Sequence, residues 1–307
     1  MSEPLERRPA GTATAETATA GSATAGVGGT ATAGTADGGS GIAGRGIALA
    51  AAALVASRLG GGVLGRLPDG LRPESEAEAY RVQSAARPLL TAGGFGRQGG
   101  WKIGCTTATM QRYLGVDSPC AGTMFLAGLW RATHRFVIPA GRRLGVECEI
   151  AVRLGADLPP RPGGWSADAV APAVAACIAA IEVVEDRYDS YPDLDTPTLI
   201  ADDFFHHAAV LGAEHERSDA RLLREATASM AINGEPVGSG AGSDVLGEPL
   251  AALAWLATAA AGWGTPLRAG EIVLLGSLVQ TCWVHPGDRV LVRNEPLGTV
   301  EATFDGA

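Results

Sequence analysis

The clearest hydrophobic pattern in the chain lies at residues 145–154, where apolar and polar side chains alternate. This period of two is typical of a β-strand with one buried face. Glu147 and Glu149 share the opposite face, with Cα atoms about 6.5–7 Å apart. Two carboxylates at this separation could both reach one hard cation, although an exposed strand face with two solvated glutamates has the same pattern.

Other periodic stretches predict a chain that mixes helices and strands. Helical spacing of apolar residues, alanine-rich runs and capping residues predict helices over residues 47–58, 74–90, 107–114, 168–181 and 249–261. Short apolar runs bounded by glycine or proline predict strands over 101–104, 181–184, 271–276, 288–292 and 298–304, and a hairpin over 230–237 around Asn233-Gly234. The C-terminal two-thirds is thus rich in strands with inserted helices, which predicts an α+β fold built on a mixed sheet or roll.

Composition separates the N-terminal segment from the rest of the chain. Residues 1–45 are Thr/Ala/Gly repeats with almost no large apolar side chain, so burial cannot offset the entropy of ordering them. We expect a disordered tail over 1–45, a helical N-terminal part over 46–100 and a β-roll domain over 101–307. We expect neither a signal peptide, because Glu3 and Glu6 precede any apolar run, nor a membrane span, which needs about 18–20 apolar residues.

Charge and cysteine content exclude several classes of partner. The chain of 307 residues has a formal net charge of −9, which argues against a general affinity for nucleic acid or anionic membranes. Its five cysteines show neither the spacing of a zinc site nor the density of a disulfide scaffold. We therefore expect a cytoplasmic protein without nucleic-acid or membrane partners.

Lys102 is the only lysine among 24 cationic side chains, all the others being arginines. A single lysine among so many arginines indicates a position where a guanidinium would not serve. The lysine ammonium is compact, and its pKa shifts on burial. The apolar neighbours Trp101 and Ile103 would make an unpaired ammonium costly. Lys102 is therefore a candidate catalytic residue, with a chance remnant of biased composition as the alternative.

Several short blocks, in their order and spacing, resemble the fumarylacetoacetate hydrolase family. The resemblance is to its 2-keto-4-pentenoate hydratase and 4-oxalocrotonate decarboxylase branch, and it covers residue 47 to the end. The blocks are GWKIGCT at 100–106, LGVDSP at 114–119, VECEI at 146–150, LGADL at 154–158, AIEVV at 180–184 with Arg187, GAGSDVLG at 240–247, PL at 249–250, LGS at 275–277 and PGD at 286–288.

This resemblance implies a mixed β-roll with a smaller helical N-terminal part, and a Mg²⁺ or Mn²⁺ ion held by Glu147, Glu149 and Glu182. Oxygen ligands of this kind suit a hard divalent ion. The resemblance implies that Lys102 lies beside the carboxylate of a 2-keto or 2-hydroxydienoic acid or moves a proton, and that the reaction runs through a metal-bound enolate. It also implies a homo-oligomeric enzyme of aromatic-compound catabolism, with a pathway enzyme as a possible partner.

The predicted pocket wall departs from the pattern of the hydratases. Cys120 stands where they commonly have an aspartate, and Phe205 stands at a serine-like position. We predict that Cys120, Phe205 and Ser277 contact the substrate together with Lys102, and that Cys120 is a small pocket-lining residue rather than a nucleophile. The missing groups are ones that relay protons or orient water.

His206 or His207 could replace the missing acid or base, because imidazole titrates near neutral pH. Adjacent residues on a strand face opposite ways, so at most one of them can point into the site. A hydrogen-bonded structural histidine is the alternative interpretation.

Alternative functions remain beside the hydratase, and the first is a 4-oxalocrotonate-type decarboxylase that uses the same enolate. A C–C bond hydrolase of the same superfamily is disfavoured. The sequence around Glu182, at the position of the third carboxylate, does not contain the Asp-x-Thr-x-Arg-Asp motif expected of hydrolases. A non-catalytic partner subunit is the last alternative. Against it stand Lys102 and the three glutamates, because adjacent carboxylates repel each other without a cation.

Overall fold

The computed structural model describes residues 41–190, 194–216 and 220–307, which belong to one compact unit. Of the tail predicted over 1–45, residues 1–40 lie outside the described residues, whereas residues 41–45 already belong to helix α1. The domain boundary predicted at residue 100 stays a prediction. The helices are α1 (Gly41–Leu59), α2 (Glu76–Leu90), α3 (Ala108–Leu114), α4 (Ala167–Val170), α5 (Thr196–Ala201) and α6 (Pro249–Gly262).

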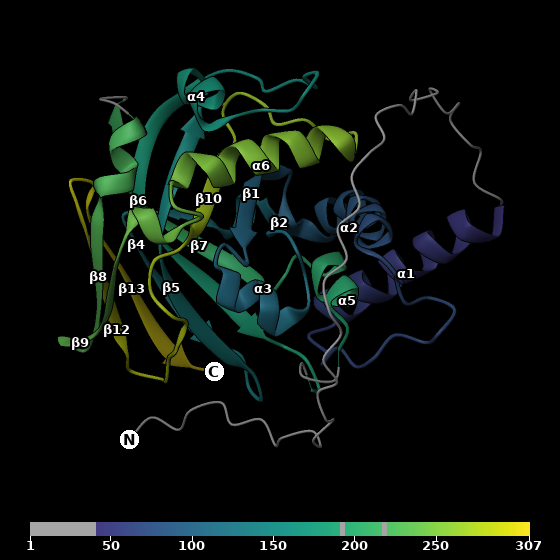
Figure 1. Ribbon diagram of the computed structural model, residues 1–307. Helices are drawn as coiled ribbons and strands as arrows, with labels where there is room; N and C mark the ends of the chain where they lie inside the picture. The colour runs from purple at the N-terminus through teal and green to yellow at the C-terminus, as the bar shows by residue number, and fades with distance from the viewer. Residues whose placement is uncertain (1–40, 191–193, 217–219) are drawn as a thin grey trace, which may run out of the picture. The chain divides into compact units, whose positions relative to one another are not determined.

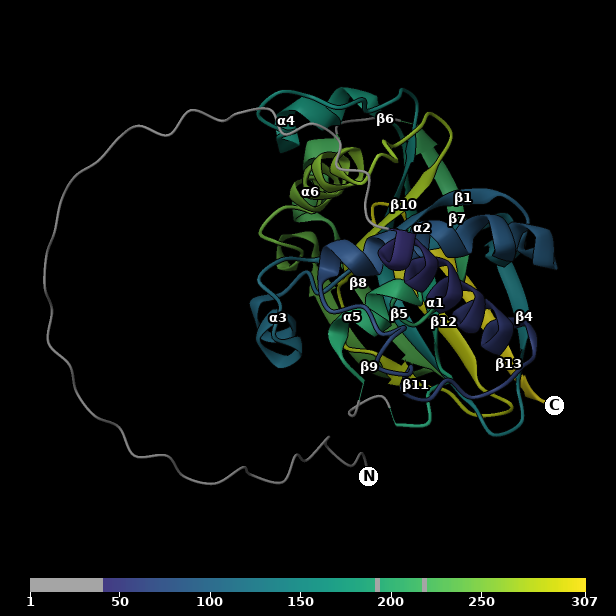
Figure 2. The same ribbon diagram turned by 90° about the vertical axis from the view of Figure 1, so that its right-hand side faces the viewer.

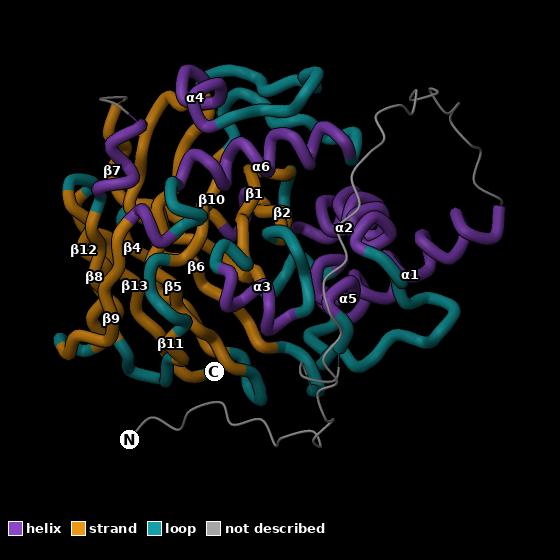
Figure 3. The backbone as a smooth tube through the Cα atoms, viewed as in Figure 1, coloured by secondary structure: helices purple, strands orange, loops and turns teal. Residues whose placement is uncertain are grey.

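The larger of two sheets has the strand order β2-β1-β10-β5-β6-β7-β3, and β11 pairs with β5. Figures 1 and 3 show that its strands are strongly curved. It is mixed, since β1–β10 and β3–β7 are parallel and the other pairs are antiparallel. Its strands are β1 (Gln98–Gly104), β2 (Cys120–Phe125), β3 (Leu129–Arg131), β5 (Arg143–Leu154), β6 (Val174–Asp186), β7 (His206–Glu216), β10 (Ile272–Ser277) and β11 (Cys282–Trp283).

The smaller sheet packs on β6 and β7 of the larger one through β12 and β13. Its strand order is β4-β13-β12-β8-β9. Figures 1 and 2 show this sheet on one side of the larger sheet and the helices α1, α2 and α5 gathered on another. Its strands are β4 (Thr133–Ile138), β8 (Thr227–Ile232), β9 (Glu235–Ala241), β12 (Arg289–Glu295) and β13 (Gly298–Gly306).

The larger sheet curls until its edge strand β2 contacts β7 near the other edge, which encloses the inner face. The outer face belongs to the main core, which also includes α6 and the smaller sheet. The inner face carries a second apolar group, the interior cluster: Met124, Ala151, Ile178, Ala180, Ala209, Leu211, Ile272 and Leu274. The predicted mixed β-roll with an α+β composition is therefore confirmed.

The helix predicted over residues 168–181 is wrong. Helix α4 ends at Val170, and strand β6 begins at Val174. Apolar residues four apart, such as Val174 and Ile178, satisfy a helical period and also the period of two of a strand. Because β6 is central and buried on both faces, it lacks the polar alternation that would have distinguished the two.

The other predicted elements are found within a few residues of their expected positions. The turn between β8 and β9 has φ values of +54° at Asn233 and +86° at Gly234, as the Asn-Gly signal predicts. Helix α3 is capped by the Thr107 side chain, which accepts the Met110 N–H. Within the described ranges, no helix is both long and apolar enough to cross a membrane.

Candidate active site

Four of the predicted site residues lie on the inner face of the curled sheet. Glu147 on β5 is the direct partner of Glu182 on β6, so the two side chains share a face. Glu149 follows two positions later on the same face. Lys102 on β1 pairs with Leu274, a member of the interior cluster. The roll thus brings together a lysine and three acids from three strands.

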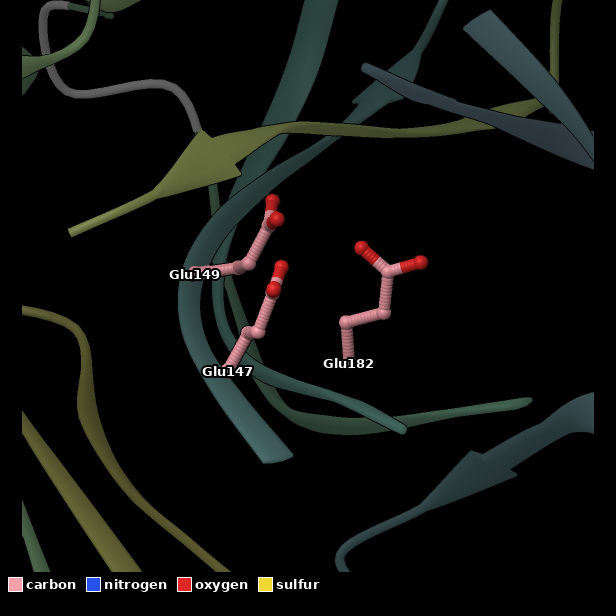
Figure 4. Close-up of side chains that lie close together, drawn as sticks. All are labelled: Glu147, Glu149 and Glu182. Atoms are coloured by element: carbon pink, nitrogen blue, oxygen red, sulfur yellow. The ribbon is translucent and has the colours of Figure 1, made fainter. Parts of the chain in front are cut away.

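The three carboxylates converge, as Figure 4 shows. Each offers one oxygen that lies within 4.8 Å of the others, and this is the one such group among the described residues. Glu149 and Glu182 are fully buried, and Glu147 is partly buried. The alternative of an exposed strand face with solvated glutamates is therefore wrong.

Two of the carboxylates are oriented by neutral donors. The Gly276 N–H donates to Glu149 Oε2 at 2.9 Å, and the Thr281 hydroxyl donates to Glu147 Oε1. Gly276 lies where the β5–β10 register shifts, which frees its N–H from the sheet ladder. Each donor therefore holds one carboxylate oxygen and leaves the second to another partner.

Glu182 is oriented by two basic groups on the same oxygen. His206 Nδ1 lies 2.8 Å and Lys102 Nζ 3.3 Å from Glu182 Oε1. These side chains are at most 4% exposed, so the pairing occurs away from water. Lys102 therefore forms its ion pair with Glu182, one of the three glutamates that the family resemblance implies as metal ligands.

The unpaired oxygens fit a divalent cation. Glu149 Oε1 and Glu182 Oε2 are buried and have no hydrogen-bond partner among the described residues. A buried carboxylate oxygen without a partner is costly, whereas a hard cation would satisfy these oxygens together. An all-oxygen donor set without thiolate suits Mg²⁺ or Mn²⁺ better than zinc or copper.

The electrostatics of the cluster agree with a missing positive charge. Burial, with the neighbouring carboxylates, raises the pKa of Glu149 well above its usual value and also raises that of Glu147. Burial alone would also raise the pKa of Glu182, but Lys102 and His206 lower it. Burial would lower the pKa of Lys102, yet the three glutamates outweigh it and raise that pKa. The raised pKa values of Glu147 and Glu149 show that their charged forms are penalised without a cation, and a bound divalent ion would relieve that penalty.

The two histidines face opposite ways, as predicted. His207 Nδ1 bonds to Glu185 at 3.0 Å, and its ring packs near Phe136 of the smaller sheet. His206 points into the roll, where burial outweighs the pull of Glu182 and lowers its pKa. Its Nε2 has no partner among the described residues. His206 is therefore the histidine that belongs to the site.

Cys120 and Ser277 lie beside the cluster but are occupied locally. Cys120 pairs with Gly104 across β1 and β2 and is fully buried. A hydrogen bond with the Cys105 thiol, followed by burial, raises the pKa of Cys120, which disfavours a thiolate at this position. The Ser277 hydroxyl donates to the Val279 carbonyl at 2.6 Å. Their contact with substrate stays a prediction.

Phe204, rather than Phe205, lies against the lysine. Lys102 Nζ is 5.0 Å from the centroid of the Phe204 ring. The Phe205 ring packs edge-on against Phe204 and Tyr188 instead. Sequence reasoning missed Phe204 and Thr281, for which no local signal exists. Gly276 stood inside a quoted block, but its N–H could not be assigned a role.

A separate cleft of about 330 Å³ lies between α2 and α6 and is lined partly by Tyr80, Trp255 and Trp263. None of the predicted site residues lines it. Trp101 points to the opposite side of β1 from Lys102, and its ring centroid is 6.1 Å from that of Trp263. The cleft is therefore on the outer side of the roll, away from the carboxylates.

Comparison with known proteins gives the family. Residues 125–305 match the model of the fumarylacetoacetate (FAA) hydrolase C-terminal family. The chain is 34% identical to a 2-keto-4-pentenoate hydratase of Paraburkholderia phymatum over 76% of its length and 87% of that protein. It is 32% identical to a 4-oxalocrotonate decarboxylase of Pseudomonas putida over 74% and 85%.

A solved structure agrees with these sequence matches. The 4-oxalocrotonate decarboxylase from Pseudomonas putida G7, complexed with magnesium and adipate, superposes with a TM-score of 0.77 at 27% identity, over 85% of this chain and 97% of that one. The order of the quoted blocks, the curled sheet and these matches agree: the chain belongs to the fumarylacetoacetate hydrolase family.

Proposed function

We propose that the protein is a divalent-metal-dependent lyase of 2-keto or 2-hydroxydienoic acids, and that it acts as a 2-keto-4-pentenoate hydratase. One observation carries the proposal: three converging carboxylates, each with one oxygen already bonded, lie beside the only lysine of the chain. Relatives named as hydratases, at 34% identity over most of their length, support it.

Glu147, Glu149 and Glu182 would hold the cation, which we take to be Mg²⁺ or Mn²⁺. Bound there, the cation would supply Lewis acidity to the oxygens of a 2-keto acid. Gly276 and Thr281 keep two of the carboxylates turned in the required direction, so little reorganisation is needed when the cation arrives.

Lys102 would bind and orient the substrate. Its ammonium, kept protonated by the nearby glutamates, can hold the substrate carboxylate or give up a proton from Nζ. Lys102 and Glu182 are almost fully buried, so bulk water has little access to either side chain. The interior cluster provides apolar surface on the same face of the sheet for the carbon chain.

The test follows the disappearance of a conjugated substrate. The protein with Mg²⁺ or Mn²⁺ should remove the dienol absorbance of 2-hydroxypenta-2,4-dienoate and form 4-hydroxy-2-oxopentanoate, identified by mass. Addition of a chelator should stop the reaction, and addition of metal should restore it. Loss of absorbance that is equally fast with a chelator would refute the metal-dependent proposal.

Decarboxylation is the second candidate, and the solved 4-oxalocrotonate decarboxylase structure, which superposes with a TM-score of 0.77, supports it. Cys120 also stands where hydratases commonly have an aspartate. Release of carbon dioxide from 2-oxohex-3-enedioate, without turnover of the dienoate, would establish the decarboxylase. Turnover of neither, without metal-dependent binding of oxalate, would indicate a non-catalytic subunit.

We further propose, from the family, a homo-oligomeric enzyme of the cytoplasm that serves aromatic-compound catabolism. A complex with another enzyme of the same pathway would fit such a role. Sedimentation velocity on the purified protein tests the oligomer, and a monomer at micromolar concentration would contradict it.

A further inference from the structure

Three consecutive residues next to the site have a left-handed backbone. Asp203, Phe204 and Phe205 have φ values of +57°, +50° and +65°, and none is glycine. This conformation costs free energy for any residue with a Cβ, and most for bulky side chains. Such a run persists only where the surroundings impose it. We call residues 203–205 the left-handed turn.

The left-handed turn delivers two side chains to the candidate site. Phe204 places its ring beside Lys102 Nζ and against Gly104, where a Cβ would lie 3.0 Å from the ring. The residue that follows the turn is His206, which bonds to Glu182 at 2.8 Å. If the backbone at 203–205 relaxed, the Phe204 ring would move away from Lys102 and His206 would move away from Glu182.

Besides backbone hydrogen bonds such as Phe204 N–H to the Leu199 carbonyl at 2.8 Å, a side chain from the first helix contacts this turn at several points. Arg58 of α1 donates from Nη1 to Asp203 Oδ2 at 2.6 Å and from Nη2 to the carbonyls of Asp202 and His206, each at 3.3 Å. The two charged side chains are 9% and 4% exposed, so their attraction is little screened. The guanidinium thus contacts the chain before, within and after the turn.

The other side of the turn is held by the sheet. Asp203 Oδ1 accepts the N–H of Thr123 on β2 at 2.9 Å. Gly122 lies so close that a Cβ there would be 2.4 Å from the Asp203 carbonyl oxygen. Asp203 therefore connects α1 to β2, the strand that pairs with Lys102's own strand β1.

We propose that Arg58 is a positioning residue: through Asp203 it imposes the left-handed turn, and so sets where Phe204 and His206 hold Lys102 and Glu182. This rests on the proposed lyase function for its kinetic consequence, but not for its structural one. The competing explanation is that Arg58 only anchors α1 and stabilises the fold.

Because Lys102 is the only lysine, a protein grown on lysine labelled with ¹³C at Cε and ¹⁵N at Nζ has one side-chain lysine signal. That signal senses the ring current of Phe204 and the bond to Glu182. We would record it for the full-length wild type, Arg58→Gln and Asp203→Asn, with Phe204→Leu as the reference for loss of the ring. Arg153→Gln, which removes a bond to Glu214 outside the turn, is the matched control.

We expect the Lys102 signal to move towards its Phe204→Leu position in Arg58→Gln and Asp203→Asn. We also expect kcat with saturating Mg²⁺ and dienoate to fall at least tenfold, measured well below the melting temperature. Arg153→Gln should match the wild type in signal and stay within twofold in kcat. Asp203→Asn decides if Arg58→Gln does not fold, because asparagine tolerates the left-handed region and still accepts the Thr123 N–H.

A lower melting temperature with an unmoved Lys102 signal and kcat within twofold would overturn the proposal and leave Arg58 as an anchor. If the wild type turns over neither the dienoate nor 2-oxohex-3-enedioate, the proposed function fails, and the lysine signal alone still decides whether Arg58 positions the site.

Discussion

Glu149 and Glu182 each keep one buried carboxylate oxygen without a hydrogen-bond partner in the described part of the chain. At the scale of single residues, this is the strongest sign of a cation, because an unpaired buried acceptor costs about 1–3 kcal/mol or more. Lys102 does not remove the need, since it lies on the already bonded Oε1 of Glu182. Glu149 Oε1 and Glu182 Oε2 therefore have no positively charged partner among the described residues.

Glu149→Gln should abolish stabilisation by Mg²⁺. Free Mg²⁺ at about 100 times its Kd should stabilise the wild type by about 2.7 kcal/mol. The metal-free variant should melt at the same or a higher temperature than the metal-free wild type, because one source of repulsion is gone. Thermal melts with and without Mg²⁺ measure both effects, with Glu271→Gln as a control outside the cluster. An equal Mg²⁺-dependent rise in Glu149→Gln would refute the ligand assignment.

Lys102→Arg should keep metal binding and lose turnover. The positive charge remains, but a planar guanidinium cannot take the place of a compact ammonium between the Phe204 ring and Glu182. We expect kcat to fall by about 100-fold or more, the scale of lost proton transfer. Calorimetric Mg²⁺ titration should give a Kd near that of the wild type. Undiminished kcat would remove the proposed role of Lys102.

Glu185 should make folding stability depend on acidity. Burial alone would raise its pKa, but His207 and Arg142 lower it from 4.5 to about 2. A lowered folded-state pKa contributes stability above pH 4.5 that is lost as the pH falls towards 2, amounting to about 3 kcal/mol in all. Urea unfolding at pH 7 and pH 3 should show a smaller loss in Glu185→Gln than in the wild type. An identical loss would contradict this assignment.

At the scale of elements, the irregularity of β10 is what supplies a donor to the site. The register with β5 shifts between Leu274 and Ser277, and Gly276 there has a φ of +127°. In a regular strand, the Gly276 N–H would donate to a carbonyl of the neighbouring strand. The bulge instead turns it to Glu149, so a departure from ideal pairing orients a candidate metal ligand.

Gly276→Ala should cost stability and metal affinity together. A Cβ at Gly276 would lie 2.6 Å from Thr106 side-chain atoms, whereas Gly270, at φ +87°, faces open space. Gly270→Ala should therefore cost only its backbone strain, about 1–2 kcal/mol, and leave the Kd for Mg²⁺ unchanged. Gly276→Ala should cost more and weaken Mg²⁺ binding, measured by urea unfolding and calorimetry. Equal effects of the two substitutions would refute the role of the bulge.

At the scale of the whole molecule, the curled sheet encloses its own inner face. Its outer face is covered by α6 and the smaller sheet, and its inner face combines an apolar cluster with the charged site. The site residues run from Lys102 on β1 to Thr281 after β10, so the site needs most of the described fold.

Removal of residues 1–40 tests the tail at this scale. Their Thr/Ala/Gly composition offers almost no apolar surface to bury, so we expect the melting temperature to stay within about 2 °C and kcat within twofold. Differential scanning calorimetry and the dienoate assay measure these quantities. A large loss of either would show that the tail contributes to the fold or the site.

Features that depend on near neighbours along the chain could be predicted before the fold was known. The period of two put Glu147 and Glu149 on one face, composition singled out Lys102, and the Asn233-Gly234 turn and most helices followed from local signals. These succeed because side-chain direction and turn chemistry are set within a few residues.

Contacts between residues far apart in the sequence depend on how the strands pair and pack. Glu182 entered through family resemblance, but its register opposite Glu147, its bond to His206 and the place of Phe204 beside Lys102 come from strand pairing and burial. The helix expected over 168–181 failed for the same reason: a central strand buried on both faces has no polar alternation, and its neighbours in space, not in sequence, decided its conformation.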